Sequence, residues 1–265
     1  MHKIEQKKKF GQNFLTDQSV IERIVSIAGQ LENKSILEIG GGSGNLTKHL
    51  IKAKPKNLIV VEIDKDYVKI LSKILQSSSV KTTLISEDIL KTDIYRYFSE
   101  PPVIFGNLPY NISSQILVKI LKFSKWPPKF KNLVLMFQKE LGDKIIGQYS
   151  TSDYSRLSIL SNLRLKNIKK FLVSPNCFFP KPKVNSLVIH FQPKPKSRFY
   201  INDINNLEKV TNILFSNKRK MINKNIKRIL NQSQVDNISN LNLNSRPSDL
   251  SPEIYYKITE FFERR

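Results

Sequence analysis

The chain has 265 residues, of which 40% are hydrophobic and 25% charged, a composition typical of a globular protein with a buried core. Its apolar runs are too short to span a membrane, its single cysteine excludes an internal disulfide framework, and its three histidines lack metal-ligand spacing. The net charge of +22 predicts a polyanionic partner, because a folded protein with such a surplus repels itself.

The first part of the chain alternates between short apolar runs and helical patterns. An amino-terminal helix is expected from an N-cap at Thr16 to about Ala28. Strands are then expected at 35–39, 58–63, 81–85, 102–106 and 132–137, with helices at about 45–53, 66–76, 113–123 and 139–147. This alternation predicts right-handed βαβ units in an α/β fold with a Rossmann-like, mostly parallel, doubly wound sheet.

The pattern changes after residue 150. A helix is expected at 154–162 and strands at 163–173 and 186–191, and two late strands without a helical crossover predict an antiparallel hairpin at the sheet edge. Beyond a proline-containing linker only helical patterns remain, at about 203–215, 217–231 and 251–263. We therefore expect two domains, a cofactor-binding catalytic domain over 1–195 and a small all-helical domain over 196–265.

A glycine-rich loop separates the first strand of the expected sheet from the next helix. Gly40, Gly42 and Gly44 let the backbone turn tightly and approach a ligand, and Glu62 ends the next strand, where a carboxylate can accept both hydroxyls of a ribose. The alternating glycines favour S-adenosylmethionine over a dinucleotide, whose pyrophosphate prefers a third glycine one residue later. Asp88, just beyond the third strand, could accept a hydrogen bond from the adenine amine of the cofactor or could be an ordinary cap.

The tetrapeptide Asn107-Leu108-Pro109-Tyr110 directly follows the fourth strand, at the strand end where ligands bind in doubly wound sheets. The exocyclic nitrogen of adenine is a poor nucleophile, because its lone pair is delocalised into the ring. The side-chain oxygen of Asn107 and the carbonyl of Leu108 would hold both amine hydrogens and turn the lone pair towards a sulfonium methyl, while Pro109 stiffens the turn. The motif predicts up to two methylations by positioning alone, without a metal, a triad or a covalent intermediate.

Two aromatic side chains are candidates to hold a base that has left its stack. Stacking on a ring is worth about 1–3 kcal/mol per base, comparable to the cost of unstacking one. The candidates are Tyr110 and Phe178, the latter in the segment 178–186. Each taken alone could also be an ordinary core aromatic.

These motifs resemble those of the ribosomal RNA adenine dimethyltransferase family, over nearly the whole chain. The segment 9–15 matches the amino-terminal motif of the family, and the resemblance implies that Asn13 and Leu15 line the methionine end of the cofactor. Other residues match further cofactor contacts of the family, its catalytic tetrapeptide and the segment that supplies its second stacking ring. They are Gly40, Glu62, Asp88, Asn107 to Tyr110 and Phe178. The resemblance implies a class I S-adenosylmethionine-dependent methyltransferase domain.

The carboxyl-terminal part separates the two branches of this family. The segments 215–220 and 246–251 resemble the helical domain of the KsgA (RsmA) branch, although Pro247 and Ser248 depart from its usual residues. This resemblance implies dimethylation of two adjacent adenosines near the 3′ end of small-subunit rRNA, within a partly assembled subunit. The other branch contains the Erm antibiotic-resistance methylases of large-subunit rRNA.

The densest basic segment runs from residue 218 to residue 228, with six basic residues and no acid. Its spacing predicts a basic helix face that contacts rRNA phosphates. The residues are Lys218, Arg219, Lys220, Lys224, Lys227 and Arg228. The alternatives are a solvated helix surface and lysine enrichment in an A·T-rich genome, and charge alone does not distinguish RNA from DNA.

Three rival functions stay open on the sequence: a nicotinamide-dependent oxidoreductase, a non-catalytic ribosome-assembly or RNA-binding protein, and an Erm-like large-subunit methylase. An oxidoreductase would leave the Asn-Leu-Pro-Tyr motif unexplained. A non-catalytic protein would not need the intact motif, which argues against that function. No secretory signal is recognisable. We therefore expect a reduced, cytoplasmic, monomeric enzyme that uses S-adenosylmethionine and no metal.

Overall fold

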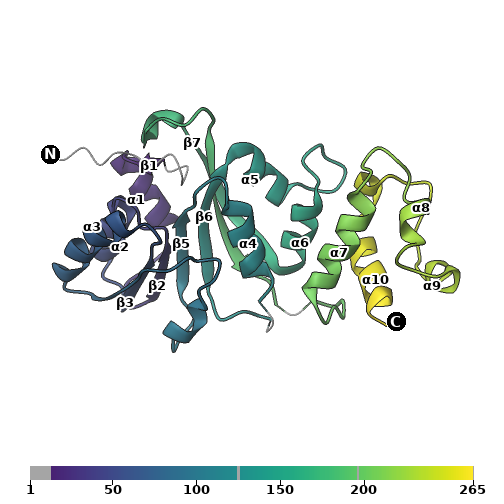
Figure 1. Ribbon diagram of the computed structural model, residues 1–265, viewed down its shortest axis with the longest axis horizontal. Helices are drawn as coiled ribbons and strands as arrows, with labels where there is room; N and C mark the ends of the chain where they lie inside the picture. The colour runs from purple at the N-terminus through teal and green to yellow at the C-terminus, as the bar shows by residue number, and fades with distance from the viewer. Residues whose placement is uncertain (1–12, 124–125, 196, 265) are drawn as a thin grey trace. The chain divides into compact units, whose positions relative to one another are not determined.

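The computed structural model describes residues 13–123, 126–195 and 197–264 (Figure 1). Residues 9–12 of the amino-terminal motif therefore lie outside the described part of the chain. The chain divides into two compact units: the first runs to Lys119 and includes Pro128–Gly142 and Asn167–Pro193, and the second comprises Ile120–Pro127, Asp143–Lys166 and Lys194–Arg265. The second unit thus contains two segments that precede the boundary expected near residue 195.

A seven-stranded sheet forms the centre of the first unit, in the order β4-β3-β2-β5-β6-β9-β7. Its strands are β2 (Ser35–Ile39), β3 (Asn57–Val61), β4 (Lys81–Ile85), β5 (Val103–Asn107), β6 (Asn132–Gln138), β7 (Leu165–Val173) and β9 (Ser186–Pro193). The strands from β4 to β6 pair in parallel, and β9 is antiparallel to β6. The predicted fold class is confirmed, with one refinement: of the two late strands, β9 lies next to β6 and only β7 is at the edge of the sheet, opposite the β4 edge.

The central strands are buried on both faces of the sheet, which explains why they are continuous apolar runs in the sequence. The helices that connect or extend them are α1 (Gln18–Ile27), α2 (Asn45–Lys52), α3 (Lys65–Gln76), α4 (Ser113–Leu121) and α5 (Lys139–Ile146), with a 3-10 turn at Ile94–Tyr97. Strand order reverses between β2 and β5, so the carboxyl ends of these two strands form the switch point at which doubly wound sheets bind ligands.

The N-cap of the first helix was predicted wrongly. Asp17, and not Thr16, caps α1, because its carboxylate accepts a hydrogen bond from the backbone of Val20 at 3.0 Å. The hydroxyl of Thr16 instead donates to the carbonyl of Cys177 at 3.2 Å. The side chain of Thr16, which the local pattern assigned to the helix cap, thus bonds to a residue 161 positions away in the chain.

A small second sheet joins distant parts of the first unit. The strand β1 (Phe14–Leu15) pairs antiparallel with β8 (Phe178–Phe179), which follows a 3-10 turn at Pro175–Cys177, with Phe14 opposite Phe179 and Leu15 opposite Phe178. Two-residue strands have no periodicity in a sequence, and this pairing was not predicted.

The second unit is helical. It contains α6 (Arg156–Arg164), α7 (Ile204–Phe215), α8 (Asn223–Ile226), α9 (Gln232–Asp236) and α10 (Pro252–Glu263), with a 3-10 turn at Pro247–Asp249, and α10 packs on both α6 and α7. None of the helices in the described part of the chain combines the length and the apolar character needed to cross a bilayer.

The long basic helix expected at 217–231 is not formed. Only Asn223–Ile226 is helical there, and Lys218 to Lys220 lie in a turn closed by the backbone bond from Lys220 to Asn217 at 3.0 Å. The backbone N–H of Ile222 donates to Ser245, which diverts this segment from a continuous helix. The six basic side chains are all exposed, but they do not share one helix face.

Candidate active site

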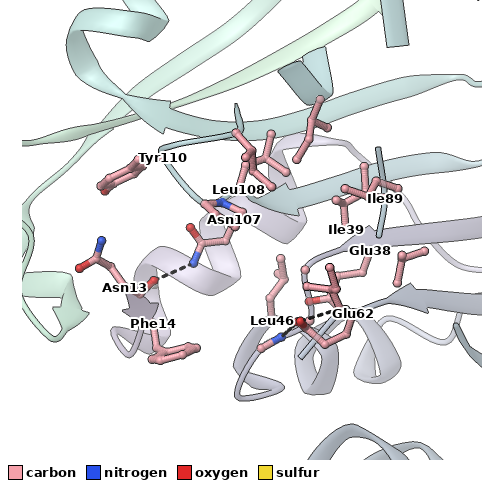
Figure 2. Close-up of a pocket in the computed structure, with 18 of the residues that line it drawn as sticks. Asn13, Phe14, Glu38, Ile39, Leu46, Glu62, Ile89, Asn107, Leu108 and Tyr110 are labelled. Atoms are coloured by element: carbon pink, nitrogen blue, oxygen red, sulfur yellow. Dashed lines mark hydrogen bonds between the residues drawn. The ribbon is translucent and has the colours of Figure 1, made fainter. Parts of the chain in front are cut away.

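A pocket of about 330 Å³ opens at the carboxyl ends of β2, β3 and β5, entirely within the first unit (Figure 2). Ten of the predicted site residues line it, and they come from five separate stretches of the chain. These residues are Asn13, Leu15, Gly40, Gly42, Glu62, Asp88, Asn107, Leu108, Pro109 and Tyr110. The fold therefore assembles the predicted cofactor and catalytic positions around one cavity.

The carboxylate of Glu62 is held by three backbone N–H groups. Gly42 donates to Oε2, and Ile63 and Asp64 donate to Oε1, each at 2.9 Å. Gly42 has a positive φ of 50°, and a Cβ atom there would lie 3.0 Å from the ring of Phe14. Because each carboxylate oxygen has two lone pairs, this fixed group retains acceptor capacity towards the pocket.

The loop that carries Asp88 is fixed from both sides. One oxygen of its carboxylate accepts the backbone N–H of Leu90 at 2.9 Å, and Asp88 also lines the pocket. Asp88 therefore caps its own turn, as one of the two alternatives predicted, and also lines the cavity, while its bond to the adenine amine stays a prediction. The ammonium of Lys119 on α4 donates to the carbonyls of Ile89 at 2.8 Å and Thr92 at 2.7 Å, which ties this loop to the helix that follows the Asn-Leu-Pro-Tyr motif.

Asn107 ends β5, and its amide is oriented by a residue 94 positions earlier. Its Nδ2 donates to the backbone carbonyl of Asn13 at 3.3 Å. Because a carbonyl only accepts, the nitrogen must face Asn13, and the amide oxygen stays available as an acceptor. Figure 2 shows this bond as a dashed line, with the Asn107 oxygen directed away from Asn13.

The rest of the tetrapeptide is held by the buried side chain of Leu108 and by hydrogen bonds at its carboxyl end. The side chain of Leu108 is 1% exposed, which fixes the backbone that carries its carbonyl. The carbonyls of Pro109 and Tyr110 accept bonds from Ile112 and Ser113, and the Leu108 carbonyl lies outside these turn bonds. Among the residues that the structure describes, none donates to the amide oxygen of Asn107 or to the carbonyl of Leu108, so both remain available as acceptors at the tip of β5.

The ring of Tyr110 is held by its hydroxyl. This group forms a hydrogen bond of 2.7 Å with the hydroxyl of Ser186 on β9, and burial raises the pKa of Tyr110. The phenol therefore stays protonated at neutral pH and serves as a fixed, neutral ring at the pocket wall. The sequence did not identify Ser186 as its partner.

Three residues of β1 and its surroundings form another wall. Asn13, Phe14 and Leu15 line the pocket, and the side-chain amide of Asn45 on α2 donates to the carbonyl of Leu15 at 2.8 Å. Neither Phe14 nor Asn45 was predicted from the sequence as a site residue. Phe14 belongs to the amino-terminal motif at 9–15, and its aromatic side chain there was the signal that could have identified it as a pocket residue.

Phe178 is not among the residues that line the pocket. Its side chain is 4% exposed and packs in the hydrophobic core, on the β8 strand opposite Leu15. The six candidate RNA-binding residues, from Lys218 to Arg228, all belong to the second unit.

Glu38 is a buried carboxyl that sequence reasoning missed. It lines the pocket, is 1% exposed, and its Oε2 has no hydrogen-bond partner in the described part of the chain. The pKa of Glu38 is raised to about 8, mainly by burial; a hydrogen bond with Thr47 opposes this shift, and the nearby carboxylate of Glu62 adds to it. A single charged residue within an otherwise apolar strand was the signal that could have revealed it.

This buried carboxyl predicts a pH dependence of stability. The folded-state pKa of Glu38 is about 8 and its ordinary value is 4.5, so its contribution to the free energy of unfolding is complete below pH 4.5 and is lost as the pH rises through about 8. We expect the free energy of unfolding of the wild type minus that of Glu38→Gln to fall over this range, by up to about 1.4 kcal/mol per pH unit. Denaturant titrations of both ligand-free proteins measure it, and a difference independent of pH would contradict it.

Comparison with known proteins decides the family. The model of the family described as "Ribosomal RNA adenine dimethylase" matches residues 3–264. The chain belongs to the ribosomal RNA adenine dimethylase family. It is 45% identical to "Ribosomal RNA small subunit methyltransferase A" of Pelagibacter ubique, over 98% of each chain, and 37% identical to the protein of that name from a Wolbachia strain of Drosophila simulans, over 94% of this chain and 91% of the relative. The predicted membership of the family is confirmed.

Solved structures support the same fold. The chain is similar to a dimethyladenosine transferase from Plasmodium falciparum, with a TM-score of 0.73, 25% identity and coverage of 92% of this chain and 95% of that one. The 23S rRNA methyltransferase ErmE matches with a TM-score of 0.68 and 23% identity, over 95% of this chain and 100% of that one, which shows a shared fold. The expectation of an enzyme of this family is confirmed, and the nicotinamide-dependent alternative is set aside.

Proposed function

We propose that this enzyme uses S-adenosylmethionine to dimethylate two adjacent adenosines near the 3′ end of small-subunit rRNA, during assembly of that subunit. The observation that carries the proposal is the pair of acceptors at the tip of β5, the amide oxygen of Asn107 and the carbonyl of Leu108. The names of the relatives that are 45% and 37% identical support the choice of the small subunit over an Erm-like target.

The residues of the pocket fit S-adenosylmethionine. The Glu62 carboxylate suits a ribose diol, and Asp88 suits the amine of adenine, since one of its oxygens is not used by the turn. Gly42 leaves space that a Cβ atom would close against Phe14. The unpartnered Oε2 of Glu38 suits a cationic ligand, because a positive charge nearby would favour the ionised carboxyl.

The chemistry follows from position. S-adenosylmethionine supplies a methyl group on a positively charged sulfur. Asn107 and Leu108 accept the two hydrogens of the adenine amine, draw its nitrogen towards tetrahedral geometry and aim the lone pair at that methyl. In each transfer the nitrogen–methyl bond would form as the methyl–sulfur bond breaks, which leaves the neutral thioether S-adenosylhomocysteine. The amine hydrogen that is replaced would leave as a proton, and the second hydrogen permits a second transfer. Orientation of this kind can lower a barrier by roughly 7–11 kcal/mol.

We further propose that Tyr110 and Phe178 hold the target base between their rings. Tyr110 lines the pocket and is anchored through Ser186. Phe178 is buried, so its ring contacts a base only if β8 shifts towards the pocket. This part of the proposal is therefore tested separately, by substituting Phe178 and measuring the KM for RNA.

The experiment that tests the function is a transfer assay with nucleoside mass spectrometry. Labelled S-adenosylmethionine and undermethylated small subunits should give dimethyladenosine, and large-subunit RNA should give none. Label only in the large subunit would favour the Erm-like alternative. Absence of label in both would favour a non-catalytic RNA-binding protein.

We propose that the exposed basic residues of the second unit bind rRNA phosphates. Replacing Lys218, Arg219 and Lys220 together by alanine should reduce the magnitude of the slope of log affinity against log salt for small subunits by up to about 2–3. Each phosphate contact releases counterions when it forms, and the variant forms fewer of these contacts. Filter binding over a salt series measures this slope. The control is the triple substitution of Lys65, Lys69 and Lys73, exposed lysines on α3 in the first unit. An equal loss in both triples would indicate a general charge effect and contradict the proposal.

We also propose that residues 196–265 form the rRNA-binding domain and residues 1–195 the catalytic one, and that the enzyme acts in the cytoplasm as a monomer without a metal. Acceptors alone position the amine in this mechanism, so activity should persist in EDTA. Loss of activity that added metal restores would overturn this part.

A further inference from the structure

The segment from Phe179 to Asn185, which we call the flanking segment, is anchored at both ends on residues of the pocket wall. At its start, Phe179 pairs with Phe14 in the small β1–β8 sheet, and Phe14 lines the pocket. Just beyond its end, Ser186 forms the 2.7 Å hydrogen bond with Tyr110, which also lines the pocket. The flanking segment is therefore held beside the pocket from two sides.

This segment exposes an aromatic ring and two cations. Phe179 is 66% exposed, although Phe178 before it is 4% exposed, because successive residues of a strand point to opposite faces. Lys181 and Lys183 are also exposed, and no acidic residue lies between Phe179 and Asn185. A single exposed phenylalanine is ordinary in proteins, but a ring followed at alternate positions by two lysines matches the stacking and phosphate contacts of single-stranded nucleic acid.

The proposed reaction creates a need for such a surface. An adenosine that leaves its stack to enter the pocket also deprives its neighbours of a stacking partner, and this loss opposes binding. An aromatic ring beside the pocket can replace the missing base without regard to sequence, because every base has a π-face.

We propose that the flanking segment binds the nucleotides next to the methylated adenosine, with Phe179 stacked on a neighbouring base and Lys181 and Lys183 against the phosphates. The inference rests on the proposed function and adds a second contact surface for its RNA substrate. Phe179 is distinct from the tetrapeptide and from Phe178, which are proposed to hold the target base itself.

The decisive variants separate stacking from apolar contact. Phe179→Ala should weaken binding of a short deproteinised RNA containing the target adenosines by about 5- to 150-fold, the range expected for loss of one base–aromatic stack. Phe179→Trp should retain affinity, and Phe179→Leu, which is apolar but has no ring, should behave like alanine. The matched control is Leu172→Ala on β7, which removes a side chain that is 56% exposed and should leave RNA affinity unchanged.

The lysines are tested through salt dependence. Replacing Lys181 and Lys183 by alanine should reduce the slope of log affinity against log salt by about 1.4, because a contact to single-stranded nucleic acid contributes about 0.7. The control replaces Lys169 and Lys170, two exposed lysines on β7, and should leave the slope unchanged.

Calorimetry with S-adenosylhomocysteine completes the experiment, since all these variants should bind it like the wild type. If the wild type methylates small subunits but Phe179→Ala binds RNA equally well, the inference is overturned and the proposed function stands. If the wild type methylates no small-subunit RNA, the proposed function fails. Loss of S-adenosylhomocysteine binding in Phe179→Ala would assign the ring a structural role. A loss of affinity for intact subunits but not for deproteinised RNA would indicate that the ring contacts a protein. Either result overturns the inference.

Discussion

Replacing Asn107 by alanine is expected to lower kcat by about 10²–10³-fold, the usual effect of removing one fixed polar group that acts on the reacting atoms. The substitution removes one of the two acceptors for the amine hydrogens, so the lone pair of adenine is no longer aimed at the methyl group. The backbone of the pocket should be unchanged, because within the described residues the Asn107 side chain bonds to the carbonyl of Asn13 and to no other group. Affinity for S-adenosylhomocysteine should therefore change by no more than about a few-fold, since one net neutral hydrogen bond is worth about 1 kcal/mol.

Two further variants sharpen this test. Asn107→Asp keeps an acceptor oxygen but cannot donate to Asn13, so it should recover only part of the lost rate. Asn111→Ala removes an exposed amide that also lines the pocket and should leave kcat close to the wild-type value. Single-turnover rates with undermethylated small subunits measure all three. An unchanged rate in Asn107→Ala would refute the mechanism, whatever the affinity for RNA.

Replacing Glu62 by alanine should weaken binding of S-adenosylhomocysteine by about 10²–10⁴-fold. Two hydrogen bonds from ribose hydroxyls to a carboxylate contribute about 1.5–3 kcal/mol each, and every 1.4 kcal/mol corresponds to tenfold in affinity. The substitution also leaves the N–H groups of Gly42, Ile63 and Asp64 without their acceptor, so part of the loss could come from a disturbed loop.

A ligand lacking ribose hydroxyls separates these two causes. The wild type should bind 2′,3′-dideoxy S-adenosylhomocysteine much more weakly than the natural compound, whereas Glu62→Ala should bind both about equally, because the partner of the hydroxyls is already absent. Glu87→Gln, at a pocket carboxylate that pairs with Arg96 at 3.3 Å, is the matched control and should discriminate like the wild type. If Glu62→Ala still prefers the natural ligand as strongly as the wild type, Glu62 does not bind the ribose.

The features predictable from sequence are those set by short-range pattern. The expected strands at 35–39 and 81–85 agree with β2 and β4, and β3, β5 and β6 differ from their expected bounds by one or two residues at one or both ends. Strands of a parallel sheet alternate with connecting helices and, in its centre, are apolar throughout, which makes them recognisable without knowledge of their neighbours. The glycine loop, Glu62 and the tetrapeptide were located for the same reason, since each is placed by the strand immediately before it.

The basic segment shows where this reasoning fails. Its spacing predicted a helix over 217–231, but the bond from Ile222 to Ser245 and the burial of Ile222, Ile226 and Ile229 determine its path. Helical propensity is worth only tenths of a kcal/mol per residue, so a few tertiary contacts override it. The lysines stay on the surface in either conformation, which is why their exposure could be expected although their arrangement could not.

Residue types and spacing were thus sufficient for the fold class, the family and ten of the residues that line the pocket, because each depends on chain neighbours within a few positions. Folding was needed to orient Asn107 through Asn13, to isolate the carboxyl of Glu38, and to bury Phe178 while exposing Phe179. Each of these depends on a partner or an enclosing surface supplied from elsewhere in the chain. Burial and hydrogen-bond partners are properties of the packed molecule, and no local pattern specifies which distant group will provide them.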